Sequence, residues 1–204
     1  MKITASICAL LVANAIPSAV AEESNGGMSL QFLALPKELK PAPVELFLSE
    51  GKTIEVDTPG HELSKSYKVP MLDTVSVGET VVDAEGKQSF KVYGSAKSIS
   101  PKQIILLIRK GKQPSDGFHL IPIDSRLPNF GGASFLFLNA SALDFAATIG
   151  DKKFTLASGK HTIIKPVPNH PPNSCQVTLF YQRPGNKKWK KFHDTRWPAN
   201  ESTR

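Results

Sequence analysis

The residues best suited to do chemistry gather near the C-terminal end of the chain, in the stretch RPGNKKWKKFHDTRW. This stretch holds both tryptophans of the 204-residue sequence and a dense group of lysines. Clustered cations concentrate anionic partners, and exposed aromatic rings stack on the planes of sugars or bases. A site for an anionic polymer would use Arg183, Lys187, Lys188, Trp189, Lys190, Lys191 and Arg196.

The same stretch also suits the last strand of a β-sheet. Side chains of an extended strand alternate between two faces, so Trp189, Lys191 and His193 would share one face and Phe192 would lie on the other. Lysines on an edge strand discourage pairing with a second chain. In this alternative Trp189 packs on the sheet while the lysines stay hydrated. A docking segment for a protein partner is a third interpretation.

A metal site would have to combine the few histidines with Cys175. Copper sites of secreted β-sandwiches use two imidazoles and a thiolate, and a short loop supplies the Cys, one His and a weak axial Met. His170 lies five residues before Cys175, but the next histidine is His193 and Met71 lies far upstream. This spacing argues against such a site, and we expect no cofactor. A metal carrier using His119, His170 and Cys175 is the remaining alternative.

Signatures of catalysis are weak. The motif GGASF at Ser134 lacks the second glycine of a strained nucleophile turn. A triad of Ser134, His161 and Asp124 can be drawn on paper, as can a carboxylate pair of Asp116 and Asp124, but geometry defines such sites. The sequence has no phosphate-cradling or dinucleotide-binding motif. We expect a non-catalytic protein, with a hydrolase acting through loops at one end of the fold as the alternative.

Short apolar and β-branched runs, closed by glycine, proline or polar clusters, must position these residues. They indicate an all-β domain, a two-sheet Greek-key sandwich of immunoglobulin-like type. The continuous apolar run QIILLI is typical of a strand covered on both faces. The expected strands are residues 29–35, 44–50, 52–58, 64–70, 73–84, 88–96, 102–110, 117–124, 133–141, 144–150, 152–158, 160–167 and 175–183.

The start of the chain is typical of a cleaved secretory signal. Lys2 precedes an apolar run that is too short to span a membrane and that ends in small residues. Cleavage after Ala21 would leave Cys175 as the single cysteine, which we expect to be buried rather than paired. We therefore expect an exported protein, periplasmic or secreted, without a transmembrane segment in the mature chain.

The expected domain organisation follows from these signals. Residues 1–21 are the signal peptide, 22–28 a flexible linker, 29–197 a single β-sandwich domain and 198–204 a C-terminal tail. Loss of Lys2 lowers the formal net charge from +7 to +6. From Arg183 onward, seven cationic residues face two acidic ones, a net of +5, so the basic character is local.

The segment from Phe130 to Pro166, followed by TLFYQRPGNKKWKKFHDTRWPANESTR, resembles a type of exported, uncharacterised β-sandwich protein of the Verrucomicrobia and related bacteria. The shared features are a strand ending in Asn, a short strand ending in Gly, a Pro-Gly turn and a Trp-containing segment near the C-terminus. The resemblance covers the last third of the chain and implies an immunoglobulin-like or related sandwich. It implies no activity. We expect a binding or structural module of the cell envelope, contacting an anionic envelope polymer or a protein partner, with no nucleic acid.

Overall fold

The computed structural model describes residues 27–35, 44–126, 129–132, 134–169 and 173–199. Almost every regular element among them is a β-strand, and the one helical piece is a 3-10 turn at Pro114–Asp116, named η1. The all-β prediction is therefore confirmed. None of the described residues form a helix with the length and apolar character needed to cross a bilayer.

The chain divides into two compact units, where the sequence predicted one domain over residues 29–197. The N-terminal unit lies within Pro17–Leu127, and the C-terminal unit within Pro128–Arg204. Each unit has a separate cluster of buried apolar residues. The strands are short and similar throughout, so their pattern alone carries no mark of the boundary.

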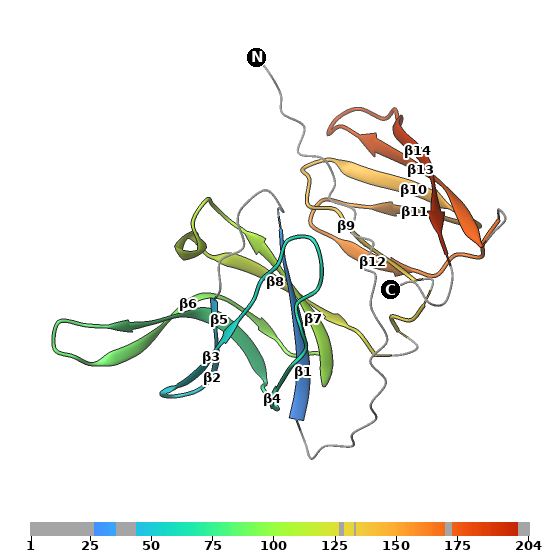
Figure 1. Ribbon diagram of the computed structural model, residues 1–204. Coiled ribbons are helices and arrows are strands. Elements are labelled where there is room, and N and C mark those ends of the chain that lie inside the picture. Colours follow the sequence, from blue (N-terminus) through green and yellow to red (C-terminus); the bar gives the residue numbers. More distant parts are fainter. Residues whose placement is uncertain (1–26, 36–43, 127–128, 133, 170–172, 200–204) are drawn as a thin grey trace. The chain divides into compact units, whose positions relative to one another are not determined.

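The N-terminal unit contains two four-stranded sheets, ordered β4-β1-β7-β8 and β3-β2-β5-β6, and β5 and β6 form a long hairpin (Figure 1). Inward residues of both sheets, such as Phe32, Leu46 and Ile105, make its core. Its strands are β1 (Gly27–Leu35), β2 (Val44–Ser49), β3 (Lys52–Val56), β4 (Tyr67–Pro70), β5 (Thr74–Val82), β6 (Gln88–Lys97), β7 (Lys102–Arg109) and β8 (Phe118–Asp124).

The pairing of β1 with β7 is parallel, whereas the other strand pairs among the described residues are antiparallel. Strand β7 contains the QIILLI run, in which Ile104 and Leu106 are buried together with Ile105 and Leu107, although neighbouring residues point to opposite faces. Burial on both faces confirms the prediction made from the continuous apolar run. It also explains why this strand shows no alternation in its sequence.

The C-terminal unit has one four-stranded sheet, ordered β11-β10-β13-β14, and a two-stranded sheet of β12 and β9. Its core is rich in aromatic rings: Trp197 lies 5.8 Å from Phe137 and 5.5 Å from Phe135, centroid to centroid. Its strands are β9 (Phe135–Leu138), β10 (Asp144–Ile149), β11 (Lys152–Leu156), β12 (His161–Ile164), β13 (Ser174–Gln182) and β14 (Lys190–Pro198).

All thirteen predicted strands overlap β1 to β13. The outer limits of the strands differ slightly from those expected. Gly27 and Met28 of the expected linker begin β1, and β14 continues to Pro198 with Ala199 buried behind it. The predicted signal peptide lies outside the described residues, and the Greek-key, immunoglobulin-like order of strands stays a prediction.

Candidate polyanion-binding surface

The predicted basic residues lie on one hairpin at the edge of the C-terminal sheet. Strand β14 is the last in the order β11-β10-β13-β14, so the interpretation of this stretch as an edge strand is confirmed. Four of the seven predicted residues lie in the connection from β13 to β14, and three lie in β14 itself. All seven side chains are exposed, and the hairpin groups them on one element of the fold: Arg183, Lys187, Lys188, Trp189, Lys190, Lys191 and Arg196.

A β-bulge interrupts the alternation expected for this strand. Phe180 pairs with Lys191 and Leu179 pairs with His193, so that Phe192 is the extra residue. Bulges of this kind bend a strand and re-aim its side chains. The ring of Phe192 contacts Phe145, at 6.2 Å between centroids, and His193 pairs with the inward-facing Leu179. His193 therefore does not share the face of Lys191, contrary to the simple alternation.

Trp189 lies over the outer face of the sheet and not in the core. It lines a shallow hollow of about 510 Å³ together with Phe180 of β13 and residues of β10 and β11. The side chain stays 40% exposed, whereas the second tryptophan, Trp197, is buried. The prediction that Trp189 packs on the sheet is thus correct in part, because Trp189 lines the hollow on the sheet but keeps an exposed surface.

Most cations of the hairpin have no acidic partner among the described residues. Asp194 accepts a hydrogen bond from Lys191 at 3.1 Å, and this bond, followed by that from Gln176, lowers the pKa of the carboxyl group. In the described part of the chain, no carboxylate pairs with the other five cations. These are Arg183, Lys187, Lys188, Lys190 and Arg196.

The structure does not assemble the residues proposed for a metal carrier. Cys175 is fully buried in the C-terminal core, as predicted, and burial raises the pKa of its thiol. His119 is an exposed residue of β8 in the N-terminal unit, and His170 lies outside the described residues. Among the residues described, no group of three or more His, Cys, Asp or Glu side chains is placed to hold a metal ion.

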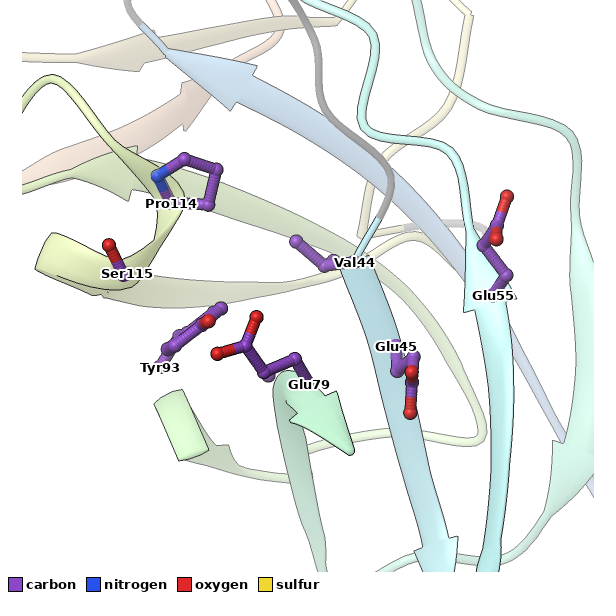
Figure 2. A pocket seen from close by; sticks show the side chains of 8 residues that line it. Val44, Glu45, Glu55, Glu79, Tyr93, Pro114 and Ser115 are labelled. Atoms are coloured by element: carbon purple, nitrogen blue, oxygen red, sulfur yellow. The ribbon is translucent and has the colours of Figure 1, made fainter. Parts of the chain in front are cut away.

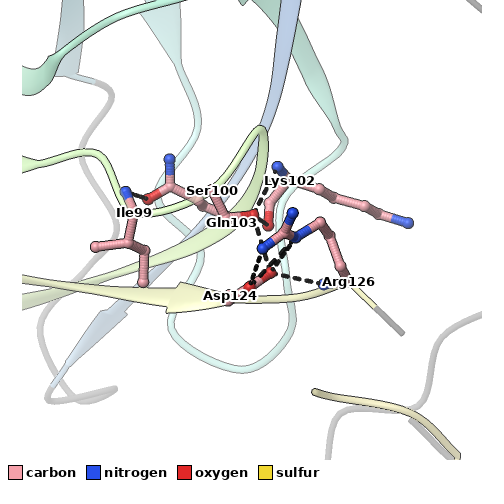
Figure 3. Close-up of polar contacts among 6 residues, drawn as sticks. All are labelled: Ile99, Ser100, Lys102, Gln103, Asp124 and Arg126. Carbon is pink, nitrogen blue, oxygen red and sulfur yellow. Dashed lines mark hydrogen bonds and ion pairs between the residues drawn. The ribbon is translucent and has the colours of Figure 1, made fainter. Parts of the chain in front are cut away.

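The geometry does not support the triad of Ser134, His161 and Asp124 or the carboxylate pair of Asp116 and Asp124. Asp124 accepts hydrogen bonds from the backbone N–H and the guanidinium group of Arg126, the shortest at 2.8 Å, and from the hydroxyl of Ser100 at 2.9 Å (Figure 3). Its carboxylate is therefore engaged within the N-terminal unit, whereas Ser134 and His161 belong to the C-terminal unit.

Asp116 precedes β8 and Asp124 ends it, so the strand separates the two by roughly 20 Å. This separation exceeds the spacing used by glycosidase carboxylates.

A second hollow, of about 420 Å³, lies in the N-terminal unit and was not predicted from the sequence. Glu45 and Glu55 pair directly across β2 and β3, and Figure 2 shows Glu79 beside Tyr93 at the same hollow. A hydrogen bond from Thr80 lowers the pKa of Glu45, which therefore does not suit the role of a general acid. Only the strand register reveals this grouping, since the three glutamates are scattered in the sequence.

No known protein-family model matches this sequence, and the curated proteins likewise include no significant match.

Proposed function

We propose that this protein is a non-catalytic binding module of the cell envelope that contacts an anionic polymer through its β13–β14 hairpin. The observation that carries the proposal is the group of five exposed cations without a carboxylate partner among the described residues, next to the partly exposed Trp189. Because these cations have no carboxylate partner there, binding a polymer breaks no ion pair of theirs. The counterions released from the polymer then favour binding.

The hairpin also has the accessibility that a polymer requires. Its basic residues lie at a sheet edge and in a connecting turn, so a flexible chain reaches them without the need for a deep cavity. The Pro-Gly turn at Gly185, which has a positive φ of 76°, reverses the chain and keeps the cations on both arms of one hairpin. Affinity of this kind comes from summed charge and depends strongly on salt.

The test is a salt titration of binding to poly-L-glutamate and to polygalacturonate. We compare the protein with a variant in which Lys187, Lys188, Lys190 and Lys191 are changed to Gln. A matched control changes four exposed lysines of the N-terminal unit to Gln: Lys52, Lys87, Lys97 and Lys112.

We expect the hairpin variant to lose most of the affinity and to show a shallower dependence of log K on log salt. The control should keep both the affinity and the slope, because its lysines lie outside the proposed surface. Equal binding by all three proteins would refute the proposal.

Export is part of the proposal and has a separate test. The apolar segment before Ala21, which ends in small residues, supports cleavage at that point. We expect protein recovered from an export-competent bacterial host to begin at Glu22, as determined by N-terminal sequencing. Protein that keeps Met1 or Lys2 would contradict it.

A further inference from the structure

The outer face of the sheet β11-β10-β13-β14 carries two ordered rows of side chains. Strand register places one residue of each strand in each row, and directly paired residues point to the same face. The first row is Thr155, Ala146, Phe180 and Lys191. The second row is Lys153, Thr148, Thr178 and Asp194. Four strands give this platform a width of roughly 14 Å.

The floor of the hollow consists of short side chains. Aromatic side chains from neighbouring segments complete its lining. Ala146, Thr148 and Thr155 line the hollow, and Phe154, Phe180 and Trp189 supply its aromatic surface. Small floor residues leave room above the sheet, whereas larger ones would fill it. The result is a broad, shallow site beside a partly exposed tryptophan. Such a site differs from the enclosed apolar pocket that binds a small hydrophobic molecule.

The polar groups of the hollow are available to a ligand. In the described part of the chain, the hydroxyls of Thr148 and Thr155 and the ammonium group of Lys153 make no hydrogen bond or ion pair. The C–H faces of a sugar ring pack on an aromatic ring, and its hydroxyls need donors and acceptors at the ring's edge. The hollow offers both kinds of contact within one surface.

We propose that the anionic polymer is a polysaccharide and that one of its sugar rings stacks on Trp189 in this hollow. This inference rests on the proposed function, since the neighbouring cations of the hairpin attract the polymer's carboxylate or sulfate groups. Lys153 extends the positive charge from the hairpin into the hollow itself. The hydroxyl-lined floor suits a sugar, because a sugar ring carries several hydroxyls that both donate and accept hydrogen bonds.

The test compares three anionic polymers: polygalacturonate, poly-L-glutamate and single-stranded poly(dT). The variant is Trp189→Ala, and Trp189→Phe keeps an aromatic ring in place. Phe192→Ala is the matched control, because Phe192 is similarly exposed but contacts Phe145 and Tyr181 instead of the hollow. Circular dichroism and thermal melting verify that each variant is folded.

We expect Trp189→Ala to weaken polygalacturonate binding about tenfold, the scale of one lost stacking contact. Binding of poly-L-glutamate should change less than twofold, and Trp189→Phe should recover part of the loss. Polygalacturonate should also shield Trp189 from iodide quenching, while the buried Trp197 contributes little to the quenching.

The outcomes separate this inference from the proposed function. If the lysine variant of the hairpin loses all three polymers but Trp189→Ala loses none, the surface binds polyanions without sugar stacking and the inference is wrong. Equal losses for polygalacturonate and poly-L-glutamate would also overturn it. Tighter, Trp189-dependent binding of poly(dT) would assign the hollow to nucleic acid. If the lysine variant binds all three like the parent, the proposed function itself fails.

Discussion

The two units of this protein share an all-β architecture but differ sharply in charge. The span Pro17–Leu127 carries thirteen Lys and Arg residues against fourteen Asp and Glu, whereas Pro128–Arg204 carries eleven against four. The first is thus near neutral at −1 and the second has a net charge of +7. Similar sandwiches can host different functions, because function depends on the side chains placed on them. The contrast places the excess of positive charge, on which the proposed polyanion binding depends, in the C-terminal unit.

The hollows of the two units repeat this contrast. In the N-terminal hollow, Glu45 accepts a hydrogen bond from Thr80, and Glu79 pairs with Lys91 at 3.6 Å. Polar groups there largely satisfy one another. In the C-terminal hollow, the hydroxyls of Thr148 and Thr155 have no partner among the described residues. The difference indicates which surface has binding capacity left for a ligand.

The largest expected effect tests whether each unit depends on its own core. Both tryptophans lie in the C-terminal unit, so tryptophan fluorescence reports unfolding there. Trp197→Ala removes a buried ring stacked on Phe137 and should lower the free energy of unfolding of this unit by about 3–5 kcal/mol. The remaining Trp189 serves as the reporter in denaturant titrations.

The matched change in the other unit is Leu46→Ala, which empties a fully buried position of the N-terminal core. It should cost that unit about 2–5 kcal/mol, visible by circular dichroism, and leave the tryptophan transition in place. If Leu46→Ala moved the tryptophan transition as far as Trp197→Ala, the two cores would unfold as one. That result would contradict the expectation that each unit depends on its own core.

A smaller effect is expected at the glycines that shape the two hairpins. A Cβ at Gly78 of β5 would lie 2.0 Å from the carbonyl oxygen of Lys91, so Gly78→Ala must displace the backbone. We expect a loss of about 2 kcal/mol or more. Gly185→Ala in the basic hairpin meets no atom within 4 Å, and only its positive φ opposes the change, at about 1 kcal/mol. Thermal melting of both variants gives the comparison, and equal losses would contradict it.

The effect expected to be smallest near neutral pH is an alkaline destabilisation of the N-terminal unit. Burial, with hydrogen bonding to Glu79, raises the pKa of Tyr93 from 10.0 to about 12. Because the unfolded state releases this proton first, stability is full below pH 10 and falls as the pH rises toward 12. Tyr93→Phe should flatten part of this fall in urea titrations followed by circular dichroism. An unchanged pH dependence would mean that Tyr93 titrates normally.

The strands were predictable because their signals are local. Alternation and turn residues mark them, and the run at Ile104 to Leu107 marks a strand buried on both faces. The parallel pairing of β1 with β7 and the division into two units were not predicted, because both depend on contacts between distant segments. The change of charge after Leu127 was the available signal for the division.

The site was predictable to a similar extent. The cations and Trp189 cluster in sequence, and the hairpin keeps them together. Phe180, Thr148 and Lys153 were missed because they come from three strands that only the register aligns. The bulge at Phe192 was missed for the same reason: it is defined by the partner strand β13 and has no mark in its own sequence.

The C-terminal hairpin, and not the N-terminal unit, is the proposed binding surface. Amide hydrogen exchange of the protein with and without saturating polygalacturonate tests it most directly. We expect slower exchange in residues 183–191, with residues 44–126 unchanged. Protection confined to residues 44–126, with none in the hairpin, would contradict it.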